Sequence, residues 1–143
     1  MQTLKQLIAS RTQDLAVASP QTPVFDALKI MAERDVGALL VLDQGKLVGI
    51  FSERDYARKI ILYGKASKDT LVGEIMSDKV LYVTPERSID ECLALMSEKK
   101  FRHLPVLDHE QQVIALVSIG DLVTATISEQ QFIIQQLERY INS

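Results

Sequence analysis

A chain of 143 residues, 47% of them hydrophobic, can form one compact domain with a buried core, which excludes a disordered or fibrous protein. Sixteen lysines and arginines against nineteen aspartates and glutamates give a net charge of −3, which does not favour nucleic-acid or membrane partners. The single cysteine, Cys92, the lack of a signal-peptide pattern and the lack of a long apolar run together predict a soluble, cytoplasmic protein.

The sequence contains an internal duplication. Pro20 is matched 65 residues later by Pro85, and residues 39–43 match residues 104–108 at the same spacing. One extra residue in the second copy moves the spacing to 66 further on, which aligns Ser52 with Ser118. Such self-similarity is typical of repeated structural units. The predicted organisation is a first repeat with its lead-in helix at 1–66, a second repeat at 67–127 and a C-terminal helix at 128–143.

The first repeat is predicted to have the order β-α-β-β-α. Val24, Leu28 and Met31 recur at spacings of four and three, as on a helix with one apolar face. Thr22 followed by Pro23 is typical of a helix start. In chain order, we expect a lead-in helix at 4–8, a strand at 14–18, a helix from 23 to about 35–37, a strand at 38–42, a hairpin turn at 43–46, a strand at 47–51 and a helix beginning at Ser52.

The second repeat has the same predicted order, and Ser88 with Glu91 forms a capping box at the start of its first long helix. We expect a lead-in segment at 72–76, a strand at 81–84, a helix from 88, a strand at 104–107, a turn at 108–112, a strand at 113–118 and a helix from 119. A last helix, capped by Ser128, has an apolar stripe that must pack on the domain or on a partner chain. That stripe consists of Phe132, Ile133, Leu137, Tyr140 and Ile141.

Both repeats contain a Ser-x-x-Asp motif where a strand gives way to a helix. Ser52 and Asp55 form the first motif, and Ser118 and Asp121 form the second. In one interpretation the two side chains only cap the helix. In the other they use the free N–H groups and the positive dipole of the helix end to bind an anionic ligand. The repetition favours ligand binding.

The sequence resembles a tandem pair of CBS domains, named after cystathionine β-synthase, of the small stand-alone bacterial type. The resemblance depends on the paired prolines, the segments 36–41 and 101–106, and the two Ser-x-x-Asp motifs, and it covers residues 3–127. It implies an α/β (α+β) fold of two β-α-β-β-α repeats related by pseudo-twofold symmetry, with the lead-in helix and the C-terminal amphipathic helix added. It further implies two clefts between the repeats and a homodimer formed through helices.

The resemblance also implies a function. Members of this family bind AMP, ADP, ATP, NAD or S-adenosylmethionine, and they act as energy or metabolite sensors without chemistry of their own. We therefore expect a regulatory protein, not an enzyme, whose ligand is AMP or a related adenine nucleotide, or NAD(H). The alternatives are an S-adenosylmethionine sensor and an interaction scaffold with vestigial clefts. The downstream protein partner is not identified by the sequence.

The resemblance places a ribose-binding carboxylate on Asp55 and on Asp121. An ionised carboxylate can accept hydrogen bonds from both hydroxyls of a cis-diol, and such charge-assisted bonds are strong. The first cleft, named the Asp55 cleft, is expected to include Ser52, Glu53, Arg54, Asp55, Met76, Val80, Leu81, Tyr82, His103 and Leu104. The second, named the Asp121 cleft, is expected to include Leu15, Ala16, Val17, Val36, Gly37, Ala38, Leu39, Arg102, Ser118, Ile119, Gly120 and Asp121.

Several of these residues have a second interpretation. Arg58 and Lys59 are candidates for phosphate binding or for a solvated helix face, and His103 is a ligand contact or a residue at the rim of the core. Leu39 and Leu104 are more typical of the core.

The two motifs also differ, because Gly120 stands where the first has Arg54. The Asp55 cleft is thus predicted to take a longer or more highly phosphorylated ligand, and the Asp121 cleft to take AMP. Cys92 falls on the apolar stripe of its helix and is expected to be a small core residue. No cluster has metal-ligand spacing, so no metal is expected.

Overall fold

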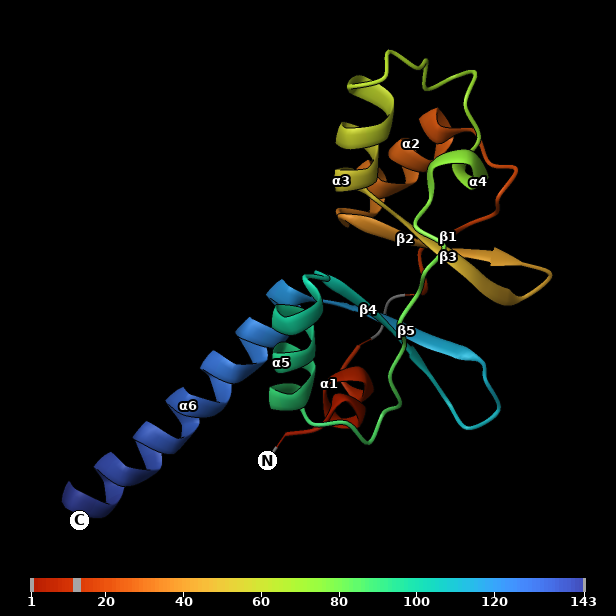
Figure 1. Ribbon diagram of the computed structural model, residues 1–143. Helices are drawn as coiled ribbons and strands as arrows, with labels where there is room; N and C mark the ends of the chain where they lie inside the picture. Colours follow the sequence, from red (N-terminus) through yellow and green to blue (C-terminus); the bar gives the residue numbers. More distant parts are fainter. Residues whose placement is uncertain (1, 12–13, 143) are drawn as a thin grey trace.

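The computed structural model describes residues 2–11 and 14–142 and forms two lobes, one for each repeat (Figure 1). In the first, β1 (Val17–Ala18) pairs in parallel with β2 (Ala38–Asp43), which pairs in antiparallel with β3 (Lys46–Ser52). The sheet packs against α2 (Val24–Arg34) and the π-helix η1 (Tyr56–Ile61), which follows the short α3 (Glu53–Asp55). The predicted mixed α/β fold is confirmed, whereas the π-helix was not predicted.

The second lobe contains an antiparallel pair, β4 (His103–Leu107) and β5 (Val113–Ser118), packed against α5 (Ile89–Lys99) and α6 (Ile119–Asn142). The strand predicted at 81–84 is reduced to a single parallel bridge between Val83 and Val106. Proline is the reason. In the first repeat the Leu40 amide donates to the Ala16 carbonyl at 3.1 Å, but Pro105 occupies the matching position and has no N–H to donate.

Three predicted boundaries differ from the observed ones. The strand expected at 14–18 is regular only over Val17–Ala18. Thr22 does not cap α2, because its hydroxyl accepts a hydrogen bond from the Ser19 amide at 3.0 Å, and the cap position belongs to Pro23. The helix expected to start at Ser128 is the second half of α6, which runs without a break and projects away from both lobes (Figure 1).

The two lead-in helices cross to the opposite lobes. Leu4 of α1 (Leu4–Ala9) is fully buried in the core of the second repeat, and its amide donates to the Arg87 carbonyl at 2.9 Å. Val72 of α4 (Val72–Ile75) is equally buried in the core of the first repeat. The chain segments that follow α1 and α4 therefore pass between the lobes, where they can line a site.

Gly49 shows how closely one of these segments approaches β3. The amide of Ile50 donates to the Ser77 carbonyl at 3.0 Å, and a Cβ atom built on Gly49 would lie 2.9 Å from that carbonyl oxygen and 2.6 Å from the sulfur of Met76. Both distances are shorter than normal contacts. The close approach of the two backbones therefore requires glycine.

We expect Gly49→Ala to lower the free energy of unfolding by about 1–3 kcal/mol, because overpacking forces backbone shifts. Gly120→Ala is the matched control, since the nearest atom to its built Cβ is the Ser118 hydroxyl at 3.6 Å. Helical alanine is favoured over glycine, so the control should be neutral or more stable. Urea unfolding monitored by circular dichroism measures both, and equal effects would contradict the prediction.

Cys92 is fully buried on the apolar face of α5, and burial raises the pKa of its thiol. It therefore belongs to the core. In the described residues, no helix combines the length and apolar character needed to cross a membrane.

Candidate functional site

Two clefts of about 590 and 630 Å³ lie between the lobes, one beside each Ser-x-x-Asp motif. These volumes fall in the range of small-molecule and cofactor sites. Gly37 and His103 line both clefts and so form the wall between them. The described residues contain no group of three or more His, Cys, Asp or Glu side chains that could hold a metal ion.

The two motifs occupy equivalent places in the two sheets. Ser52 is paired with Ala38 at the end of β3, and Ser118 is paired with His103 at the end of β5. The amide that begins each helix donates to the residue just before the neighbouring strand, from Glu53 to the Gly37 carbonyl at 3.1 Å and from Ile119 to the Arg102 carbonyl at 2.9 Å. Each motif therefore presents its carboxylate at a strand-to-helix junction facing a cleft.

Both motifs form a capping box, and in both the box uses only one carboxylate oxygen. The Ser52 amide donates to Oδ2 of Asp55 at 3.0 Å, and the Ser118 amide donates to Oδ2 of Asp121 at 2.8 Å. The return bonds run from the aspartate amides to the serine hydroxyls at 3.2 and 3.1 Å. Capping and ligand binding are thus compatible, because Oδ1 is not used by the cap.

Asp55 is nevertheless occupied by protein on both oxygens. Its Oδ2 also accepts a hydrogen bond from the Ser52 hydroxyl at 3.1 Å, and its Oδ1 accepts one from the Ser77 hydroxyl at 2.9 Å. Nζ of Lys59 lies 3.4 Å from the same Oδ1, and Asp55 is only 7% exposed. A ribose could reach this carboxylate only if Ser77 or Lys59 withdrew.

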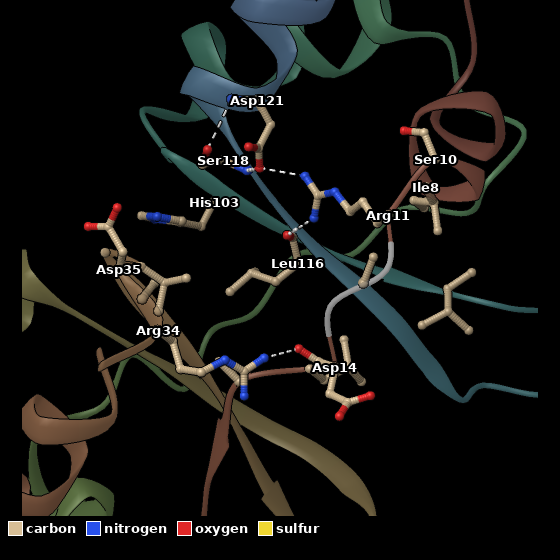
Figure 2. A pocket seen from close by; sticks show the side chains of 17 residues that line it. Ile8, Ser10, Arg11, Asp14, Arg34, Asp35, His103, Leu116, Ser118 and Asp121 are labelled. Carbon is tan, nitrogen blue, oxygen red and sulfur yellow. Dashed lines mark hydrogen bonds and ion pairs between the residues drawn. The ribbon is translucent and has the colours of Figure 1, made fainter. Parts of the chain in front are cut away.

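Asp121 is more accessible. Nη2 of Arg11 lies 2.6 Å from its Oδ2, and the carboxylate side chain is 39% exposed (Figure 2). No hydrogen bond or ion pair to Oδ1 is formed by residues 2–11 or 14–142. Burial raises the pKa of Asp121, but the Ser118 hydrogen bonds and Arg11 outweigh this and hold the pKa below its usual value. An ionised oxygen therefore faces the cleft.

The structure brings most of the predicted Asp55-cleft residues to one surface. Met76, Tyr82 and Leu104 lie outside it: Leu104 is fully buried, Met76 packs behind Gly49, and the Tyr82 hydroxyl donates to Gln111 at 3.3 Å. The predicted residues that line this cleft are Ser52, Glu53, Arg54, Asp55, Arg58, Lys59, Val80, Leu81 and His103.

The Asp121 cleft shows a similar division. Leu39 is fully buried in the first core, Arg102 lines the Asp55 cleft instead, and Val17, Ile119 and Gly120 lie outside the lining. The predicted residues that line it are Leu15, Ala16, Val36, Gly37, Ala38, Ser118 and Asp121.

Several charged lining residues were missed. They are Arg11, Asp14, Arg34 and Asp35 in the Asp121 cleft, and Lys79 and Lys100 in the Asp55 cleft. One signal could have found two of them. The lead-in segments match at the spacing that aligns Leu4 with Val72, and the same spacing aligns Arg11 with Lys79.

The clefts differ strongly in charge. The Asp55 cleft has two carboxylates, on Glu53 and Asp55, against six cationic side chains, on Arg54, Arg58, Lys59, Lys79, Lys100 and Arg102. The Asp121 cleft has three carboxylates, on Asp14, Asp35 and Asp121, against the two guanidinium groups of Arg11 and Arg34. Burial, which is the largest influence, lowers the pKa of His103, so its imidazole is neutral at pH 7. The Asp55 cleft is therefore the more attractive to several phosphates.

The sequence pattern of the CBS domain matches residues 5–62 and 72–128. The chain belongs to the CBS-domain family. The predicted tandem pair is thereby confirmed, and the two matched segments coincide with the two lobes apart from the exchanged lead-in helices.

Solved structures and a curated relative support this membership. A CBS-domain protein from Burkholderia ambifaria MC40-6 is 48% identical, with a TM-score of 0.84 over 90% of this chain and 96% of that one. The mitochondrial protein CBSX3 of Arabidopsis thaliana is 44% identical over 82% of this chain, which spans 59% of the length of CBSX3. CBSX2, whose structure was solved in complex with AMP, is 30% identical, with a TM-score of 0.73 over 91% of this chain and 99% of that one.

Proposed function

We propose that this CBS pair is a regulatory protein that binds an adenine nucleotide and has no catalytic activity of its own. The observation that carries the proposal is Asp121, which presents an ionised oxygen to a cleft of about 590 Å³. A carboxylate in that position can accept both hydroxyls of a ribose. The relative CBSX2 was crystallised with AMP, which supports the same ligand class here.

The charge difference between the clefts supports two kinds of ligand. AMP has one phosphate and suits the Asp121 cleft, which has two arginines. ATP or NAD(H) has more phosphate charge and suits the six cationic side chains of the Asp55 cleft. The Asp55 carboxylate must release Ser77 or Lys59 before it can hold a ribose. We therefore expect the ribose contact to contribute less to ligand affinity in the Asp55 cleft than in the Asp121 cleft.

Titration calorimetry with AMP, ADP, ATP, NAD⁺, NADH and S-adenosylmethionine tests the proposal. We expect AMP to bind, with a second, distinguishable binding event for ATP or NAD(H), because the clefts differ in charge. Two identical sites for one nucleotide would contradict the assignment of different ligands. If none of the compounds binds, the protein is better explained as an interaction scaffold with vestigial clefts. If only S-adenosylmethionine binds tightly, it is better explained as an S-adenosylmethionine sensor.

We further propose that the protein is a homodimer held by α6. Large apolar residues recur at helical spacing along its whole exposed length, and Leu122 and Ala125, which pack on the lobe, lie on a different face. These residues, named the α6 seam, are Ile119, Val123, Ile127, Ile134, Leu137 and Ile141. They include Leu137 and Ile141 of the predicted stripe, whose other members, Phe132, Ile133 and Tyr140, are exposed as well. Apolar residues three, four or seven positions apart along one face are typical of helix pairs. A second copy offers the same seam, and such self-complementary pairing is usual in homodimers.

Sensing also requires a ligand to bind two conformations of the protein unequally. Asp121 stands in the first turn of α6, so the ligand contact and the proposed dimer helix belong to one element. The cytoplasmic location remains a prediction from the sequence, and the relative CBSX3 is named as mitochondrial.

A further inference from the structure

Arg11 follows α1 and extends its side chain over the Asp121 cleft (Figure 2). One guanidinium nitrogen lies 2.6 Å from Oδ2 of Asp121, and the other donates to the Leu116 carbonyl at 2.9 Å. The side chain is 31% exposed, so these polar contacts hold it more than packing does. Exposed ion pairs of this kind contribute little to stability. A role in folding alone does not account for the placement.

The Asp121 cleft has few cations for a phosphate. Of its described lining residues, only Arg11 and Arg34 have side chains that are cationic at pH 7, and the guanidinium of Arg34 donates to the Asp14 carbonyl (Figure 2). Three carboxylates line the same space. A phosphate that entered without Arg11 would meet a net negative surface.

The chemistry of a nucleotide brings its phosphate close to Arg11. One methylene and one oxygen join the phosphate to the ribose ring, so a ribose bound to Asp121 places its phosphate within reach of a side chain already beside that carboxylate. A cis-diol bonded to both carboxylate oxygens would compete with Arg11 for Oδ2, the oxygen with which Arg11 is paired. Guanidinium groups bind phosphate well, often through two hydrogen bonds.

We propose that Arg11 is the phosphate-recognition residue of the Asp121 cleft. In the free protein it neutralises Asp121, and when a ribose takes that carboxylate the guanidinium transfers to the phosphate. The inference rests on the proposed nucleotide binding and adds its selectivity: a nucleotide compensates for the lost ion pair, whereas a nucleoside does not. The protein should therefore prefer AMP to adenosine through this one side chain.

The test is a pair of titrations, with AMP and with adenosine, on the wild type, Arg11→Ala and Arg11→Lys. Asp121→Ala defines which binding component belongs to this cleft. In Arg11→Ala, we expect AMP affinity to fall about 10- to 100-fold, as for loss of a charge-assisted hydrogen bond. Adenosine affinity should stay the same or increase, because the competing ion pair is gone. Arg11→Lys keeps the charge but not the paired donors, and should lose less.

Arg87→Ala is the matched control, because it removes an arginine whose partner is Glu91 at 3.3 Å and which lines neither cleft. It should change neither affinity. If Arg11→Ala keeps the wild-type ratio of AMP to adenosine affinity, the inference is overturned while the proposed function stands. If the wild type binds neither compound, the proposed binding of AMP itself fails. If AMP binds but Asp121→Ala removes no binding component, the assignment of AMP to the Asp121 cleft fails, and the inference fails with it.

Discussion

Replacing Asp121 by alanine should weaken AMP binding to its cleft by about 10- to 100-fold, which corresponds to the loss of about 1.5–3 kcal/mol from charge-assisted hydrogen bonds. The carboxylate is ionised and partly exposed, with one oxygen unused by the described residues. Asp121→Asn should recover little of the loss, since the neutral amide has one acceptor oxygen in place of two. Calorimetric titration with AMP measures both variants.

Asp90→Ala is the matched control, because it also removes an acid from the first turn of a helix, here α5. That variant should bind AMP as the wild type does. Equal losses in Asp90→Ala and Asp121→Ala would show that the effect comes from net charge or helix stability and not from a ribose contact. Unchanged binding in Asp121→Ala would leave capping as the sole role of this residue.

Asp55→Ala should affect the stability of the protein more than its binding of AMP. Both of its oxygens are bonded within the protein, so removal takes away the acceptor of the Ser52 amide and of the Ser77 hydroxyl, whereas Lys59 keeps its bond to the Ile75 carbonyl at 2.9 Å. Loss of a helix cap costs about 0.5–2 kcal/mol, so this variant should lose stability while AMP binding at the other cleft is kept. The comparison separates two motifs that look alike in the sequence.

The pH dependence of AMP binding follows from the same site. The pKa of Asp121 is below its usual value, so this carboxylate stays ionised as the pH falls through the neutral range. The pKa of His103 is also lowered, chiefly by burial, so its imidazole gains a proton only below the range typical of histidine. Neither group should therefore make binding vary near neutral pH.

Patterns in the sequence predicted those features of the fold that depend on residues close together in the chain. The capping box at Ser88 and the hairpin turn at 43–46 depend on residues a few positions apart, and both are found in the structure. The turn includes Gln44 and Gly45 at positive φ, as a tight hairpin requires. Because the two repeats match in sequence, the order of elements predicted for the first repeat was also predicted for the second.

Features set by contacts between distant segments were not predicted. The exchange of α1 and α4 between the lobes places Arg11 beside Asp121 and Ser77 beside Asp55, and no local pattern encodes either contact. These contacts explain why two similar motifs differ, with one carboxylate open and the other enclosed. The lost strand before Pro85 is different, since proline at 105 was visible in the sequence and forbids the ladder bond.

Placing two glutamates in the α6 seam, as Ile134→Glu with Leu137→Glu, should convert the proposed dimer to a monomer. These side chains are 53% and 57% exposed in the single chain, so the change should be tolerated by the monomer fold. In a helix pair they would be buried, and burying unpaired charges costs several kcal/mol. Sedimentation or light scattering over a range of concentrations measures the mass, and circular dichroism confirms that the fold remains.

Gln135→Glu with Gln136→Glu is the matched control, because it adds the same charge to the same helix at exposed positions that lie on faces away from the seam. This control should remain a dimer, whereas the seam variant should not. A wild type that is monomeric at every concentration would contradict the proposal, and so would a seam variant that keeps the wild-type mass. Asp121 lies in the first turn of α6, so the ligand contact and the seam belong to one helix. If ligand and partner act through that helix, addition of AMP should shift the measured dimer affinity. By linkage, dimerisation would then shift AMP affinity by the same factor.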